Sequence, residues 1–119
     1  MNMKEIKELS LIEKKSLEQM GLKLSEEVGE CSQALLSYLK ASGSEYKELG
    51  IQDVKEECVD VIMVASSIFY KLGAEESELD ELMDKKIKKW KEKTNKWNEL
   101  KQLLEHTKKN KWINIRYLR

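Results

Sequence analysis

Proline is absent from this chain of 119 residues, and histidine, cysteine and glycine occur only once, twice and five times. The lack of proline and the abundance of Leu, Glu and Lys predict an all-α protein. A single histidine, His106, argues against a histidine-rich metal site and against a Ser-His-Asp triad. Cys31 and Cys58 show no Cys-x-x-Cys spacing. We interpret them as small buried hydrophobic residues rather than as a disulfide or a metal site.

An excess of charge of one sign is also lacking, because 22 basic residues balance 22 acidic ones. This balance argues against a general nucleic-acid or membrane-surface binder, so we expect neither partner. The longest uncharged run, Val61–Tyr70, is much shorter than the roughly 20 residues that span a bilayer. The charged start, Met1–Glu8, does not resemble a secretory signal, and we therefore expect a cytoplasmic protein.

The few glycines divide the chain into four predicted helices. Gly21, Gly43, Gly50 and Gly73 are the candidate breaks, and acidic residues after Gly73 suit the start of the last helix. A chain of this length supports one core, which we place in residues 1–105, with residues 106–119 as a C-terminal tail of undecided structure. The predicted helices are Lys4–Met20, Leu22–Lys40, one that ends at Leu72, and Glu75–Glu105.

Two of these helices carry acidic residues at matching positions beside an apolar stripe. The stripes consist of Leu24, Val28, Cys31, Leu35 and Leu39, and of Val54, Cys58, Val61, Ala65 and Phe69. Glu27 and Glu30 are three residues apart, as are Glu57 and Asp60, so each pair shares one side of its helix. If the two helices are antiparallel, the four carboxylates converge.

Four converging carboxylates would repel one another unless a cation neutralised them. Because their ligand atoms are all oxygen, they favour a hard ion, Mg²⁺ or Mn²⁺, which in turn suits a phosphate substrate. Ferritin-like di-iron chemistry is excluded, since the sequence has no Glu-x-x-His pair. The plain alternatives concern the neighbouring acids. Glu56 would complete a capping box with Asp53, and Glu26 would be a solvated surface residue.

The last helix is rich in lysine from Lys85 to Lys93. Most of this run fits a solvated face, but Lys86 falls within the apolar stripe of the helix and Lys89 lies on its edge. An inward lysine requires an anion, either the carboxylate cluster or a bound phosphate. The alternative is that its stem packs while its amine reaches water. Trp90 and Trp97 are interpreted as core residues.

These motifs resemble those of the MazG-like all-α nucleoside triphosphate pyrophosphohydrolases. The likeness lies in Lys23–Glu30, which contains Glu-Glu-x-x-Glu, in the later Glu57-x-x-Asp60, and in Lys86 and Trp90 of the Lys-rich helix. It covers about Leu17 to Lys93. The resemblance implies an antiparallel four-helix bundle completed by dimerisation, as a homodimer or homotetramer.

The resemblance also implies an activity, the cleavage of a nucleoside triphosphate between its α and β phosphates. It assigns Mg²⁺ binding to Glu27, Glu30, Glu57 and Asp60. Glu26 or Glu56 would orient the attacking water. Lys86 and Lys89 would stabilise the leaving pyrophosphate.

Two other interpretations stay open from the sequence. A phosphoribosyl-ATP pyrophosphohydrolase would share the architecture and the bond cleaved, whereas a non-catalytic helical module would bind a partner chain through its last helix. The sequence also makes a geometric prediction. Convergence of the acids requires a turn near Gly43, with the third helix beginning well before Asp53 or with Glu45–Gly50 running back along the pair.

Overall fold

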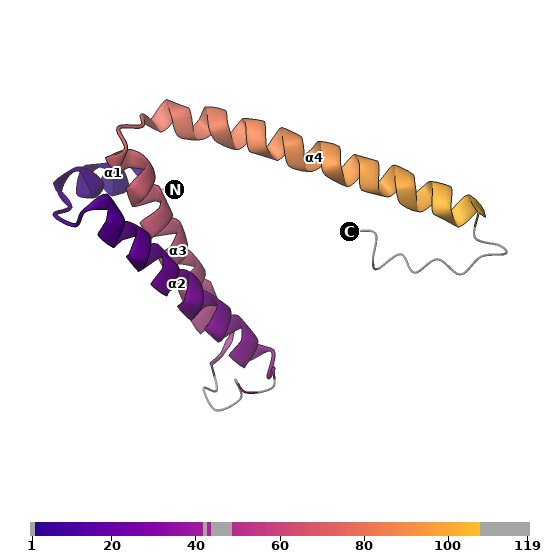
Figure 1. The fold of residues 1–119 in the computed structure, drawn as a ribbon, viewed down its shortest axis with the longest axis horizontal. Coiled ribbons are helices and arrows are strands. Elements are labelled where there is room, and N and C mark those ends of the chain that lie inside the picture. Colours follow the sequence, from indigo (N-terminus) through magenta and orange to yellow (C-terminus); the bar gives the residue numbers. More distant parts are fainter. Residues whose placement is uncertain (1, 42, 44–48, 108–119) are drawn as a thin grey trace. The chain divides into compact units, whose positions relative to one another are not determined.

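The computed structural model describes residues 2–41, 43 and 49–107. These residues form four helices and no strand, which confirms the all-α prediction (Figure 1). The helices are α1 (Met3–Ile12), α2 (Leu17–Tyr38), α3 (Ile51–Lys71) and α4 (Glu76–Thr107). The chain divides into two units. The first, Met1–Glu76, contains α1, α2 and α3, and the second begins at Ser77 and contains α4 except its first residue.

The start of α2 differs from the prediction, which ended the first helix at Met20. The break lies earlier, because Ser16 and Gln19 form a capping box: the Gln19 N–H donates to Ser16 Oγ at 3.1 Å, and the Ser16 N–H donates to Gln19 Oε1 at 2.9 Å. Gly21 lies inside α2, where glycine costs only about 1 kcal/mol relative to alanine. The hydrogen-bonded cap therefore outweighs glycine in setting the boundary.

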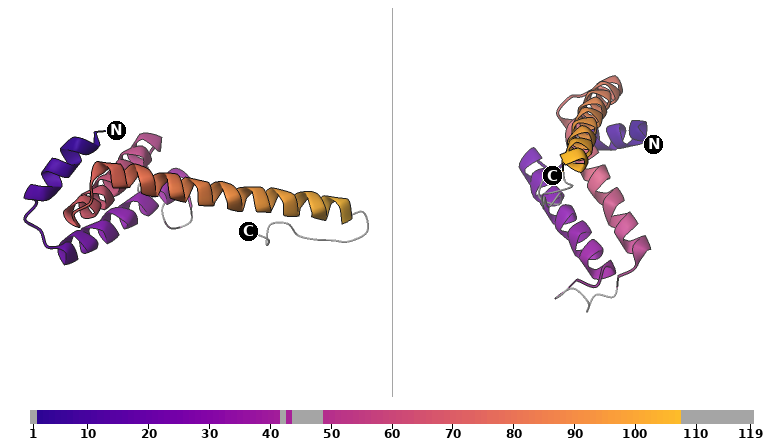
Figure 2. Two further views of the ribbon diagram at one scale, coloured as in Figure 1. Left: turned by 90° about the horizontal axis from the view of Figure 1, so that it is seen from above. Right: turned by 90° about the vertical axis from the view of Figure 1, so that its right-hand side faces the viewer.

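Helices α2 and α3 lie side by side and run in opposite directions (Figures 1 and 2). Of the two alternatives predicted for this connection, a third helix that begins well before Asp53 is not found, because α3 starts at Ile51. Most of Glu45–Gly50 falls outside the described residues. However, the Leu49 N–H donates to Ser37 Oγ at 3.1 Å, so the chain has returned to the level of Ser37 before α3 begins.

This return brings the acidic motifs level with each other. Glu27 precedes Ser37 by as many residues as Val59 follows Leu49. Residues Leu39–Ala41 close α2, with Lys40 in the left-handed region at φ 56°, and Gly43 also has a positive φ of 88°. The predicted turn near Gly43 therefore has the backbone of a turn. An extended Gly50 then leads into α3 and covers more distance per residue than a helix does.

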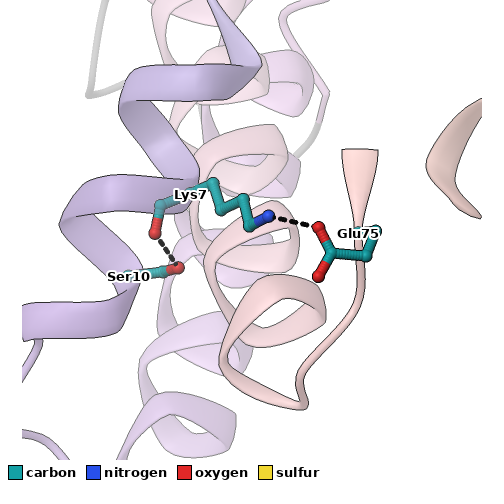
Figure 3. Close-up of polar contacts among 3 residues, drawn as sticks. All are labelled: Lys7, Ser10 and Glu75. Atoms are coloured by element: carbon teal, nitrogen blue, oxygen red, sulfur yellow. Dashed lines mark hydrogen bonds and ion pairs between the residues drawn. The ribbon is translucent and has the colours of Figure 1, made fainter. Parts of the chain in front are cut away.

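Helix α1 is attached to the C-terminal end of α3 by polar contacts (Figure 3). Lys7 Nζ lies 2.6 Å from Glu75 Oε2, and Ser10 Oγ donates to the Lys7 carbonyl at 2.6 Å. Lys71 Nζ donates to the Glu13 carbonyl just after α1 ends. Tyr70, which is fully buried in the same region, stacks edge-to-face against Phe69. The Lys7–Glu75 and Lys71–Glu13 contacts hold α1 against the end of the hairpin opposite to the Gly43 turn, whereas the Ser10–Lys7 bond lies within α1 and the Phe69–Tyr70 contact within α3.

The core of the first unit is small. Its buried apolar side chains are Met20, Ala34, Tyr70 and Ala74. The apolar stripe predicted for α2 is shifted: Leu24 and Cys31 are half-buried, but Val28, Leu35 and Leu39 are exposed. The most buried positions on α2 are instead Met20, Glu27, Ala34 and Ser37. The small Ala34 and Ser37 allow α3 to approach closely, and this contact draws Glu27 inside.

No described residue of α4 is buried. Of the two tryptophans predicted to be core residues, Trp90 is 72% exposed and Trp97 is half-buried. Helix α4 extends two residues past the predicted boundary at Glu105, and almost all of the predicted tail 106–119 lies outside the described residues. Across the described ranges, none of the helices combines the length and apolarity needed to cross a membrane.

Candidate metal centre

Three carboxylates from two helices meet in the hairpin. Glu27 projects from α2, and Glu57 and Asp60 project from α3. One oxygen from each lies within 4.8 Å of the others. The three side chains differ in exposure: Glu27 is buried, Glu57 is half-buried and Asp60 is exposed. The cluster is therefore open to solvent on the Asp60 side. Oxygen ligands with one open side are the kind of group that a hard cation such as Mg²⁺ or Mn²⁺ uses in proteins.

The burial of Glu27 distinguishes this cluster from ordinary surface acids. Glu27 is only 7% exposed, and its Oε1 lies 3.0 Å from Lys23 Nζ. Its other oxygen, Oε2, is buried without a hydrogen-bond partner among the described residues, as is Oε2 of Glu57. Burying a carboxylate oxygen with no partner is costly. A cation between the two helices would supply the missing partner to both oxygens.

The electrostatics agree with this crowding of negative charge. Burial raises the pKa of Glu57 above its ordinary value, and the charges of Asp60 and Glu27 raise it further. The pKa of Glu30 is also raised, mainly by the charge of Glu27, then by burial and by Glu57. Glu30 is exposed and is not one of the three converging residues. Its side chain nevertheless lies within the field of the cluster.

Glu26 and Glu56, the predicted water-orienting residues, are both exposed. Glu26 Oε1 lies 3.6 Å from Lys23 Nζ, so its carboxylate faces a lysine shared with Glu27. Glu56 lines an open depression of about 380 Å³ together with Asp60 and three further residues of α3. The capping-box alternative for Glu56 is wrong, because it is Asp53 that accepts the N–H of Gly50, at 2.8 Å.

Lys86 and Lys89, the predicted phosphate-binding residues, lie on α4 in the second unit. Both are exposed. The inward position of Lys86 stays a prediction, since α4 belongs to a separate unit and none of its described residues is buried within that unit. The structure brings together three of the eight predicted site residues in one cluster and places a fourth, Glu30, beside it.

Comparison with known proteins adds no assignment. No family model, curated protein or solved structure matches this chain. The functional argument accordingly depends on the residues and their geometry.

A pair of thiols lies next to the acidic cluster and was not predicted from the sequence. Cys31 Sγ and Cys58 Sγ are 3.7 Å apart, one on α2 and one on α3. The prediction that both are buried is wrong, since Cys31 is half-buried and Cys58 is exposed. Hydrogen bonding to Cys58 raises the pKa of the Cys31 thiol, and burial raises it further. Each cysteine directly follows an acid of the motif, Glu30 or Glu57.

The raised pKa of Glu57 predicts how the metal-free protein responds to pH. A carboxyl whose pKa is higher in the folded state stabilises the fold below its ordinary value, near 4.5, and this contribution is lost as pH rises through the raised value. We therefore expect the melting temperature in chelator to fall with rising pH above about 4.5, and to fall less in Glu57→Gln. Glu92→Gln, a change at an exposed position of α4, should follow the wild type. Parallel melting curves for Glu57→Gln and the wild type would contradict this prediction.

Proposed function

We propose that this chain is a Mg²⁺-dependent nucleoside triphosphate pyrophosphohydrolase that releases a nucleoside monophosphate and pyrophosphate. The observation that carries the proposal is the convergence of Glu27, Glu57 and Asp60 with two buried oxygens that lack partners. The order of the acidic motifs along α2 and α3, which resembles that of the MazG-like family, supports the same function. The hairpin also supports it, because it brings both motifs to the same level.

In this proposal, Glu27, Glu57 and Asp60 hold Mg²⁺ or Mn²⁺, and Glu30 is the fourth ligand. When bound, such an ion offsets the negative charge of the phosphate chain and makes water more acidic. Glu27 is fixed by burial and by its contact with Lys23, so it sets the inner edge of the site. Asp60 is exposed and adjoins the open depression, so it faces the side from which a phosphate chain can enter.

The attacking water needs a carboxylate that accepts its proton and orients it. Both Glu26 and Glu56 belong to the proposal, and the structure favours Glu56 for this role. Glu56 shares the open depression with Asp60, whereas the carboxylate of Glu26 already faces Lys23. Of the proposed metal ligands, Asp60 lines that depression together with Glu56.

Lys86 and Lys89 complete the proposal as residues that stabilise charge on the leaving pyrophosphate. We expect Lys86→Met to reduce turnover by about tenfold, and Lys91→Met, on the same helix, by less than about twofold. Steady-state kinetics with one triphosphate measure both variants. Equal losses would show that the lysine run acts only as a diffuse positive field.

The proposed architecture is an antiparallel four-helix bundle that a second copy of the chain completes. Large apolar side chains stay exposed on α2 and α4 in the single chain, including Leu22, Leu36, Met83 and Trp90. Such exposure is unusual for a monomer, and a second copy carries the matching apolar stripe. The sedimentation coefficient of the purified chain measures this association.

A product analysis tests the proposed activity. The chain is incubated with Mg²⁺ and a panel of ordinary and modified nucleoside triphosphates that also contains phosphoribosyl-ATP, and the products are separated. We expect a monophosphate and pyrophosphate in equal amounts, and no reaction in chelator. Cleavage of phosphoribosyl-ATP alone would assign the biosynthetic alternative. Release of inorganic phosphate with a diphosphate, or no turnover of any compound, would reject the proposal, and the second result favours a helical interaction module.

A further inference from the structure

The two thiols lie in the contact between α2 and α3, next to the acidic cluster. On α2, Cys31 comes one helical turn after Glu27 and so lies within about 40° of it around the helix axis. On α3, Cys58 directly follows Glu57. The two sulfur atoms meet between the helices, 3.7 Å apart.

At 3.7 Å, the sulfur atoms of Cys31 and Cys58 are in van der Waals contact. One atom belongs to α2 and the other to α3. A disulfide requires a sulfur separation of about 2.05 Å, which rotation of the side chains and a small shift of the helices can provide. Cys58 is exposed and can meet a small oxidant, while half-buried Cys31 lies directly behind it. The pair thus has an accessible thiol and a second thiol placed to react with it.

We infer that Cys31 and Cys58 are an oxidation site, at which a hydroperoxide converts the two thiols into a reversible disulfide that links α2 to α3. This inference does not depend on the proposed hydrolysis, since it uses only the contact between the sulfur atoms and their exposure. The link lies one residue from a proposed metal ligand on each helix, Glu30 on α2 and Glu57 on α3. It therefore fixes the hairpin that presents the acidic cluster.

The reaction proceeds in two balanced steps. Cys58 Sγ attacks one oxygen of the hydroperoxide, an S–O bond forms as the O–O bond breaks, and with hydrogen peroxide the leaving oxygen departs as water. Cys31 Sγ then attacks the sulfenic sulfur of Cys58, an S–S bond forms as the S–O bond breaks, and a second water leaves. The two thiols lose two electrons and two protons, which the peroxide takes up. A dithiol reductant reverses the change by exchange.

The link should stabilise the first unit. The disulfide closes a loop between residues 31 and 58 and so reduces the conformational entropy of the unfolded chain. We expect the melting temperature of the oxidised chain to exceed that of the reduced chain by about 10 °C.

The test treats the full reduced chain with hydrogen peroxide in equimolar amount and then blocks any remaining thiols. We expect the loss of both titratable thiols, a mass lower by two hydrogen atoms, a Cys31–Cys58 cross-linked peptide within one chain, and the higher melting temperature. Dithiothreitol should restore the original values. Cys31→Ser and Cys58→Ser, which nearly conserve side-chain volume, should show neither the mass change nor the stabilisation.

Three results would overturn the inference. The first is that both thiols stay titratable after treatment. The second is that Cys58 gains oxygen without a link to Cys31. The third is that the link joins two chains, which would mean that the sulfur contact within the hairpin does not direct the reaction.

Discussion

Replacing Glu57 by glutamine should lower the rate of nucleoside triphosphate hydrolysis by at least about 100-fold, because it removes the charge of one proposed metal ligand while conserving its shape. Glu57 is half-buried and its Oε2 lacks a partner among the described residues, so no neighbouring side chain replaces its role. The helical content should stay close to that of the wild type, since the neutral side chain relieves repulsion with Asp60 and Glu27. Initial rates at saturating Mg²⁺ and circular dichroism measure the two effects.

The matched control is Glu92→Gln, which makes the same chemical change at an exposed position of α4. It should leave the rate within about twofold of the wild type. A Glu57→Gln variant with undiminished activity would show that Glu57 is not a ligand. A variant that loses both activity and helical content would show a structural role instead.

Mg²⁺ should raise the melting temperature of the metal-free protein by about 10 °C when its concentration is about 100 times the dissociation constant. The reason is that the ion binds the folded hairpin, where the acids converge, and not the separated acids of the unfolded chain. In Glu27→Gln most of this increase should disappear, because the buried ligand loses its charge. Thermal unfolding followed by circular dichroism, with and without Mg²⁺, checks the prediction.

Glu26→Gln is the control for the Mg²⁺ effect, because Glu26 is the exposed neighbour of Glu27 and contacts the same lysine. It should keep the increase in melting temperature. An equal increase in the wild type, Glu26→Gln and Glu27→Gln would assign the effect to ions distributed over an acidic surface. That result would contradict a site built around Glu27.

Helical periodicity, together with an antiparallel pairing of the two helices, predicted that four carboxylates converge; Glu27, Glu57 and Asp60 do so, whereas Glu30 lies beside them. Acids spaced by three residues on two helices stay on one side of each helix whatever the details of packing. The sequence did not predict that Glu27 would be among the most buried residues of α2. That result follows from Ala34 and Ser37, whose small side chains let α3 pack against their side of α2 rather than against Val28 and Leu35.

The boundaries that were wrong had local causes in the sequence. The Ser16 and Gln19 spacing is typical of a capping box and marks the start of α2 better than Gly21 does. The contact between Leu49 and Ser37 depends on the backbone of the connection, which helical periodicity does not describe. The pairing of Cys31 with Cys58 was not predicted, because superposing Glu27 and Glu30 on Glu57 and Asp60 places Cys31 on Val61 rather than on Cys58.

The exposure of α4 could not be predicted from its apolar stripe. The stripe indicates that one face of α4 packs against an apolar surface. The same helical period is expected whether that surface belongs to the core of this chain or to a second copy of it. Trp90 is an example: its position in the stripe predicted a buried side chain, but the side chain is 72% exposed in the single chain. The roles of Lys86 and Lys89 share this ambiguity, because they depend on what α4 contacts.

The central claim is that Glu27, Glu57 and Asp60 bind one divalent cation, and titration with Mn²⁺ tests it most directly. The metal-free chain is titrated while electron paramagnetic resonance records the free ion, and Mg²⁺ is then added as competitor. The account predicts saturable binding that Mg²⁺ displaces, at least about tenfold weaker in Glu27→Gln and Glu57→Gln and unchanged in Glu92→Gln. Equal Mn²⁺ binding by the wild type and all three variants would contradict it.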